Sequence, residues 1–224
     1  MALILCLETA TKSCSVALAQ DGKLLACKEE VSEKYSHSEQ LTVFIETLLE
    51  EQNWQAKDLD AIAVSKGPGS YTGLRIGVST AKGLCFALDK PLIAISTLEA
   101  MAVGMAQKQL GKMYCPMIDA RRMEVYCSLY KDGQQLADII AKIIDEDSFF
   151  KELEKEEVFF FGDGADKCQE TITHSNATFV ANVFPTAKDM LMLAEEAYSR
   201  QDFEDVAYFE PYYLKDFVAG VKNS

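Results

Sequence analysis

The chain has 224 residues, of which 49% are hydrophobic and 25% charged, the balance of a globular protein with an ample core. Its net charge of −13 opposes direct nucleic-acid binding, which depends largely on Lys and Arg, so a basic partner would have to hold any RNA. No apolar run reaches the roughly 18 residues of a membrane span. The apolar N-terminus lacks the basic start of a signal peptide. We therefore expect a cytoplasmic protein without membrane contact.

The first half of the chain starts with three predicted strands and a helix. Apolar or alternating residues predict strands over 2–9, 13–20 and 23–31, with Asp21-Gly22 as a hairpin turn. Apolar residues at helical spacing predict a helix over Ser36–Gln52. The elements that follow are a strand over 60–65, a glycine-rich loop over 66–70, a helix over Thr72–Leu88, a strand over 91–95 and a helix from about residue 97.

The second half repeats this order. Its predicted elements are strands over 114–119, 123–130 and 137–144 with a turn at Asp132-Gly133, a short helix over 147–153, a strand over 158–161, a glycine loop over 162–165, a helix, a strand over 178–180 and a last helix over 186–198. Each half therefore reads β-β-β-α-β-α-β-α. This repeat is typical of two tandem actin-like α/β domains of the ribonuclease H-like (ASKHA) kind, each with a mixed five-stranded sheet. We expect the domains at 1–100 and 101–224, facing each other across a cleft.

The most distinctive motif is the glycine-rich string from Lys66 to Gly77. Its spacing matches neither a Walker A loop nor a dinucleotide fingerprint. Gly67, Gly69 and Ser70 form a turn between a strand and a helix, where backbone N–H groups meet the positive end of the helix. Two interpretations stay open: a contact with an anion or a nucleotide phosphate, and a tight turn whose glycines allow close packing.

Small residues recur along the helix that follows. Gly73, Gly77 and Ala81 are spaced by four and form a flat ridge on one face. Such a ridge either packs against the chain's own sheet or forms a subunit interface. Arg121 and Arg122 follow a predicted strand, so they either reach the cleft or pair with nearby acids at the surface.

Four segments of the chain resemble the TsaB family: ILCLETATKSCSVAL near the start, SKGPGSYTGLRIGVSTAKGL, DARRMEVY (Asp119 to Tyr126) and PYYLK (Pro211 to Lys215). The resemblance extends from end to end. It implies a non-catalytic subunit in the synthesis of tRNA threonylcarbamoyladenosine at position 37, which binds and activates the catalytic paralogue TsaD together with the ATPase TsaE. It also implies that tRNA is reached through this complex, and that a homodimer forms when TsaD is absent.

The resemblance further implies where partner and nucleotide contacts belong. The helices over 36–52 and 72–88 are expected to pair with those of TsaD, with the interface candidates Leu41, Phe44, Gly73, Arg75, Gly77, Val78, Ala81 and Lys82. The loops that hold a nucleotide in actin-like proteins correspond to Glu8, Thr9, Gly67, Gly69, Ser70, Gly162 and Gly164. At the first loop, Ala10 replaces a glycine that would let a phosphate approach, so the loops are degenerate candidates.

A metal site is not expected. The catalytic paralogue is expected to hold its metal through a His-x-x-x-His motif, and the matching residues here are Thr97 and Met101, which offer no imidazole. His37 is expected to be an exposed residue at a helix start. The chain is thus predicted to have no catalytic residue and no cofactor of its own, while the complex uses ATP and a metal held by TsaD. The alternative is a freestanding actin-fold kinase for a small metabolite, or a nucleotide-binding protein.

Overall fold

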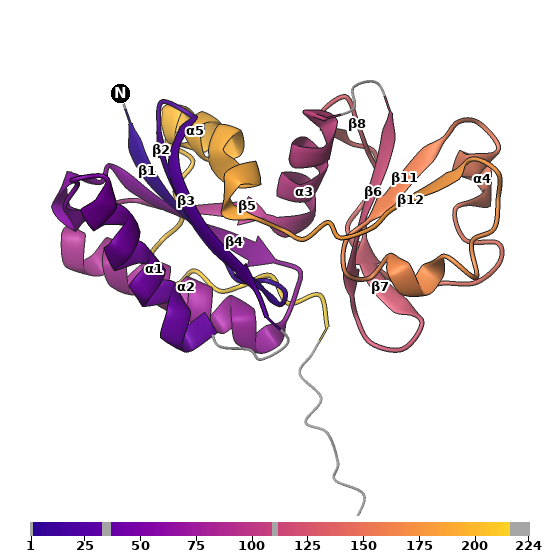
Figure 1. The fold of residues 1–224 in the computed structure, drawn as a ribbon, viewed down its shortest axis with the longest axis horizontal. Coiled ribbons are helices and arrows are strands. Elements are labelled where there is room, and N and C mark those ends of the chain that lie inside the picture. Colours follow the sequence, from indigo (N-terminus) through magenta and orange to yellow (C-terminus); the bar gives the residue numbers. More distant parts are fainter. Residues whose placement is uncertain (1, 33–36, 109–111, 216–224) are drawn as a thin grey trace, which may run out of the picture.

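The first five strands form one mixed sheet in the computed structural model, which describes residues 2–32, 37–108 and 112–215 (Figure 1). The strand order is β3-β2-β1-β4-β5, with antiparallel pairing among β1 to β3 and parallel pairing of β4 with β1 and β5. The strands are β1 (Leu3–Glu8), β2 (Ser13–Gln20), β3 (Lys23–Val31), β4 (Ala61–Gly67) and β5 (Leu92–Ser96). The apolar runs of β1 and β4 are buried, as in parallel sheets covered on both faces.

Helices cover both faces of this first sheet. On one face, α1 (His37–Glu51) and α2 (Tyr71–Leu88) enclose a core that the short 3-10 turn η1 (Ala56–Asp58) extends. On the opposite face lie the 3-10 turn η3 (Ala187–Met190) and α5 (Leu191–Arg200). Figure 1 shows α5 above the sheet and the α1–α2 pair below it.

The second sheet repeats the topology of the first. Its main path is β10-β7-β6-β11-β12, again with one antiparallel side and one parallel side. Off this path, the short strand β8 pairs with β6, and β9 pairs with β8. The strands are β6 (Met113–Asp119), β7 (Glu124–Cys127), β8 (Tyr130–Lys131), β9 (Gln134–Gln135), β10 (Ile140–Ile143), β11 (Val158–Phe161) and β12 (Ala177–Val180). α3 (Thr97–Ala106) covers one face, and α4 (Phe150–Leu153) with the 3-10 turn η2 (Asp166–Cys168) covers the other.

The packing differs from contiguous halves divided at 1–100 and 101–224. From η3 onward the chain returns to the first sheet, where α5 contacts β1 and β5 and Glu204 bridges to Leu92. Meanwhile α3 gives Leu98 and Met101 to the core of the second unit. The reason is burial: without η3 and α5, the apolar face of the first sheet formed by residues such as Ile4 and Ile93 would be exposed to water.

The duplicated order and the fold class are confirmed, with several local differences. The second sheet has seven strands rather than the expected five, and the helix expected over 147–153 is the shorter α4. The strand expected over 123–130 is divided into β7 and β8, because β6 pairs with each of them at a different point along its length. The helix expected after Gly164 is only the turn η2, and the last helix begins as the 3-10 turn η3. None of the described helices is both long and apolar enough to cross a membrane.

Candidate functional site

A cleft of 570 Å³ opens between the two units, where the carboxyl ends of β1, β4, β6 and β11 meet. Its principal lining residues are Ala10, Thr11, Gly69, Ser70, Tyr71 and Thr72 from the first unit, Asp119, Arg121, Arg122, Glu124, Tyr126 and Asp163 from the second, and Tyr212, Tyr213, Leu214 and Lys215 from the C-terminal segment. Of the two positions left open for Arg121 and Arg122, the structure shows the cleft. It also brings together tyrosines and acids from three of the family-like segments, none of which the sequence had assigned to a site.

The glycine-rich loop packs tightly on the turn that follows β1. The N–H of Ser70 donates to the carbonyl of Ala10 at 2.6 Å, and the hydroxyl of Thr9 donates to the carbonyl of Gly73 at 2.8 Å. A Cβ atom at Gly69 or Gly73 would approach the Ala10 or Thr9 backbone closer than 3.0 Å. The missing side chains of these glycines therefore leave room for the backbone of Thr9 and Ala10. This favours the tight-turn interpretation over a phosphate contact at those positions.

Glu8 is fully buried at the end of β1 and does not line the cleft. Its Oε1 accepts hydrogen bonds from the N–H of Ala10 at 2.6 Å and from the hydroxyl of Ser65 at 2.9 Å. Its Oε2 has no partner among the described residues. Burial raises the pKa of Glu8 to about 7. The carboxyl group of Glu8, which the resemblance to actin-like proteins assigned to a nucleotide loop, thus stabilises the turn between β1 and β2.

The glycine loop of the second unit is built in the same way. A Cβ atom at Gly162 or Gly164 would collide with the backbone of Met117 or Ile118 at the end of β6. Between the two glycines, Asp163 accepts a hydrogen bond from the N–H of Asp119 at 3.1 Å, and burial raises its pKa. Asp163, rather than the glycines, is the residue that this loop presents to the cleft.

The C-terminal residues 203–215, here called the C-terminal strap, run along α2 into the cleft (Figure 1). Lys82 donates to the carbonyls of Ala207 at 3.2 Å and Phe209 at 2.9 Å. Arg75 stacks on the ring of Tyr71 at 4.1 Å and donates to the hydroxyl of Tyr213 at 3.2 Å. The basic side chains of α2 that we expected at a partner interface therefore hold the chain's own strap.

Comparisons with known proteins agree with this duplicated architecture. The chain matches the family model described as "TsaD: tRNA N6-adenosine threonylcarbamoyltransferase" over residues 30–222. The "tRNA threonylcarbamoyladenosine biosynthesis protein TsaB" of Escherichia coli K12 is 31% identical over 228 residues, covering 98% of this chain and 97% of the relative. The protein of the same name from Haemophilus influenzae is 30% identical over 231 residues, covering 98% and 96%.

The solved structure of YeaZ from Pseudomonas aeruginosa superimposes with a TM-score of 0.85 at 30% identity, covering 96% of this chain and all of that one. The chain belongs to the TsaB family. Its two sheets of like order give this TsaB-family chain the actin-like ASKHA architecture.

The positions aligned with a metal motif lie inside this TsaB-family protein. Thr97 and Met101 are buried in α3, at 0% and 1% exposure, and the described residues contain no group of three metal-ligating side chains. His37, expected to be exposed, is instead 2% exposed, with its Nε2 2.7 Å from the carbonyl of Thr11. That expectation was wrong because the histidine anchors the start of α1 to the turn after β1.

Several interface candidates of this TsaB-family chain also face inward. Leu41, Val78 and Ala81 are buried in the core between α1, α2 and the first sheet, with Phe44 partly buried against it. A Cβ atom at Gly77 would meet the hydroxyl of Thr9 closer than 3.0 Å. These residues were expected at a partner interface, but they are buried within the chain. The small-residue ridge of α2 packs against the chain's own first unit.

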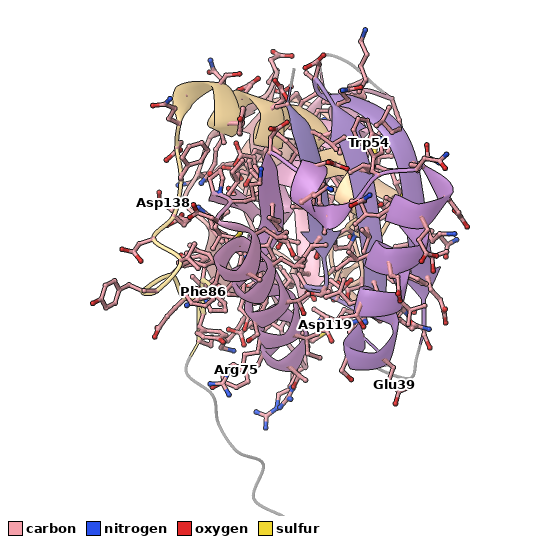
Figure 2. All side chains as sticks on the ribbon, turned by 90° about the vertical axis from the view of Figure 1, so that its left-hand side faces the viewer. Glu39, Trp54, Arg75, Phe86, Asp119 and Asp138 are labelled. Atoms are coloured by element: carbon pink, nitrogen blue, oxygen red, sulfur yellow. The ribbon has the colours of Figure 1, made fainter. Side chains whose placement is uncertain are left out.

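The outward face of α1 and α2 is formed by different residues. On α2, Phe86 is 85% exposed and a Cβ atom at Gly83 would meet nothing within 4 Å. On α1, Val43 is 54% exposed. Figure 2 looks onto this face and shows Phe86 and Arg75 along α2 and Glu39 at the start of α1. We call the surface made by Val43, Gly83 and Phe86 the α1–α2 face.

Proposed function

We propose that this TsaB-family chain is a non-catalytic scaffold subunit in the synthesis of tRNA threonylcarbamoyladenosine at position 37. It binds and activates a TsaD-type transferase together with a TsaE-type ATPase. The proposal takes the pathway from the names of its TsaB relatives, whose similarity covers nearly the whole chain. A cytoplasmic location is part of it.

The exposed α1–α2 face is the observation that carries the scaffold role. A phenylalanine that is 85% exposed costs hydrophobic free energy unless another surface covers it. The open position at Gly83 lets a second helix approach α2 closely. Two helices with such an exposed seam suit pairing with two helices of a paralogue. When the paralogue is absent, the same face suits a symmetric homodimer.

The division of labour follows from the residues that replace the metal motif. Thr97 and Met101 supply no imidazole and are enclosed by the core of the second unit. In this proposal the metal and ATP belong to the partner subunits, and tRNA is bound through the complex. The kinase alternative draws no support from the first phosphate loop, because Thr9 and Ala10 of that loop fill the space beside Gly69 and Gly73.

The test is association with a TsaD-type paralogue and reconstitution of threonylcarbamoyladenosine synthesis on tRNA. We expect Phe86→Glu to weaken association about tenfold or more, because it places a charge in an apolar contact. We expect the far-UV circular dichroism of this variant to match the wild type, since the side chain touches little of its own fold.

Met192→Glu is the matched control, because Met192 is an exposed apolar side chain, at 51%, that lies on α5, on the opposite face of the first sheet. Undiminished association of Phe86→Glu would contradict the assignment of the face. Synthesis that proceeds equally well without this chain would contradict the scaffold role itself.

A further inference from the structure

This chain has few arginines, and three of them lie at or beside the cleft. The sequence contains 22 Lys and Arg residues, and only four are arginines: Arg75, Arg121, Arg122 and Arg200. Arg121 and Arg122 line the cleft, and Arg75 is held by two tyrosines that line it. Within the described part of the chain, the remote Arg200 on α5 is the one arginine in an ion pair, with Glu196 at 2.6 Å. Arginine suits phosphate recognition better than lysine, because its planar group donates two parallel hydrogen bonds.

The backbone of Arg121 and Arg122 adopts a conformation that is unfavourable for residues with long side chains. Both lie in the left-handed region, with φ of 71° and 52°, between β6 and β7. Two consecutive residues with long side chains rarely adopt this conformation, which glycine and asparagine accept far more readily. Backbone strain of this kind gathers at binding sites, where the rest of the structure maintains it. Both side chains are exposed, and neither forms an ion pair with any described residue.

The nearby acids do not neutralise these arginines. Asp119 pairs with Lys167, and Glu124 pairs with Lys215 of the C-terminal strap. Asp163 is the remaining acid of the cleft lining, and its pKa is raised by burial. Arg121 and Arg122 are thus left without a paired acid among the described residues, in a chain whose net charge is −13.

Aromatic rings accompany the guanidinium groups. The rings of Tyr71 and Tyr213 lie 4.8 Å apart, and Tyr126 and the 41%-exposed Tyr212 also line the cleft. Proteins that bind single-stranded nucleic acid combine basic side chains along its phosphate backbone with aromatic rings on which its bases stack.

We propose that Arg121 and Arg122, together with Arg75, bind the phosphate backbone of a single-stranded RNA segment across the mouth of the cleft. The proposal rests on the proposed function, to which it adds a direct RNA contact by this subunit. It revises the expectation from net charge that only a partner holds RNA.

The test is fluorescence anisotropy of the full chain with a labelled single-stranded RNA of about 12 nucleotides, a length within the site sizes of such grooves. We expect a Kd on the order of 10 µM at about 50 mM salt, weakening as salt rises. Arg121→Asn combined with Arg122→Gly should weaken binding about tenfold and lower the salt slope by roughly 0.7 for each lost phosphate contact. Because asparagine and glycine accept this turn, the melting temperature should not fall.

The matched control removes two charges elsewhere, with Lys57→Gln in η1 and Arg200→Gln in α5, and should bind like the wild type. Absence of wild-type binding, or equal binding by the arginine variant, overturns the proposal. Equal competition by polyglutamate overturns it in favour of an acidic protein, and equal competition by a mononucleotide overturns it in favour of a free nucleotide. The arginine variant should still associate with the TsaD-type paralogue, so failure here is distinguishable from failure of the scaffold role.

Discussion

The hydroxyl of Thr9 occupies the place that a side chain at Gly77 would need. This hydroxyl donates to the carbonyl of Gly73 at 2.8 Å. A Cβ atom on Gly77 would come closer than 3.0 Å to the hydroxyl oxygen of Thr9. The turn after β1 and the helix α2 therefore interlock through one hydroxyl and two glycines. This contact explains the glycine spacing of the motif without a ligand.

Gly77→Ala should destabilise the fold by about 2 kcal/mol, because the new methyl group displaces Thr9 and breaks its hydrogen bond. Urea unfolding measures this loss. Gly83→Ala, in the same helix at an open position, should instead stabilise by up to about 1 kcal/mol. Combining Thr9→Ala with Gly77→Ala should cost less than the two single changes added together. Full additivity would show that the two residues do not compete for space.

Stability should fall as pH rises from about 4.5 to 8. Burial raises the pKa of Glu8 from 4.5 to about 7 and that of Asp189 from 3.8 to about 6. A raised pKa means that the folded chain binds the proton more tightly than the unfolded chain. The resulting stabilisation is complete below the unfolded pKa values and is lost as pH passes through the folded ones. For Glu8 alone the loss is of the order of 3 kcal/mol.

Glu8→Gln should flatten this pH profile, because the amide stays neutral and its oxygen can still accept from Ala10 and Ser65. Urea unfolding at a series of pH values tests the prediction. Glu29 and Glu157 have lowered pKa values, so their contributions change only on the acid side, outside this window. An unchanged profile in Glu8→Gln would mean that Glu8 ionises without cost.

Gly104→Ala should loosen the contact between the two units. A Cβ atom there would come closer than 3.0 Å to the carboxyl group of Asp189, where α3 meets η3. We expect a loss of about 1 to 3 kcal/mol, measured by thermal unfolding. Adding Asp189→Ala should recover part of it by opening the space. If the double variant is no more stable than Gly104→Ala, the clash is not the cause.

Phe209→Ala should release the C-terminal strap from α2. Phe209 is half buried against the first core, and its carbonyl accepts from Lys82. Truncating an aromatic ring that is only partly buried should cost about 2 kcal/mol. Hydrogen exchange should show the amide of Tyr212, which donates to the carbonyl of Lys66 at 2.7 Å, opening faster. Tyr208→Ala is the control, since Tyr208 is 85% exposed.

Local periodicity predicted most of the secondary structure correctly, because strands and helices with strong apolar patterns form where their own residues favour them. The first three strands and α2 agree with the structure to within about two residues at each end, the usual uncertainty of such boundaries. The turns at Asp21-Gly22 and Asp132-Gly133 were predicted for the same reason, and both pairs have positive φ. The position of His37 was not predicted, since the carbonyl that fixes it belongs to a turn 26 residues away.

The sequence by itself determined the duplicated α/β pattern, the family and the glycine string, all of which are properties of neighbouring residues. Only the tertiary structure decided which surface each glycine meets and which side chains remain for a partner. It showed that Gly73 and Gly77 face Thr9, that Arg75 and Lys82 hold the strap, and that α5 covers the first sheet. The physical reason is that burial and close approach depend on residues far apart in the chain.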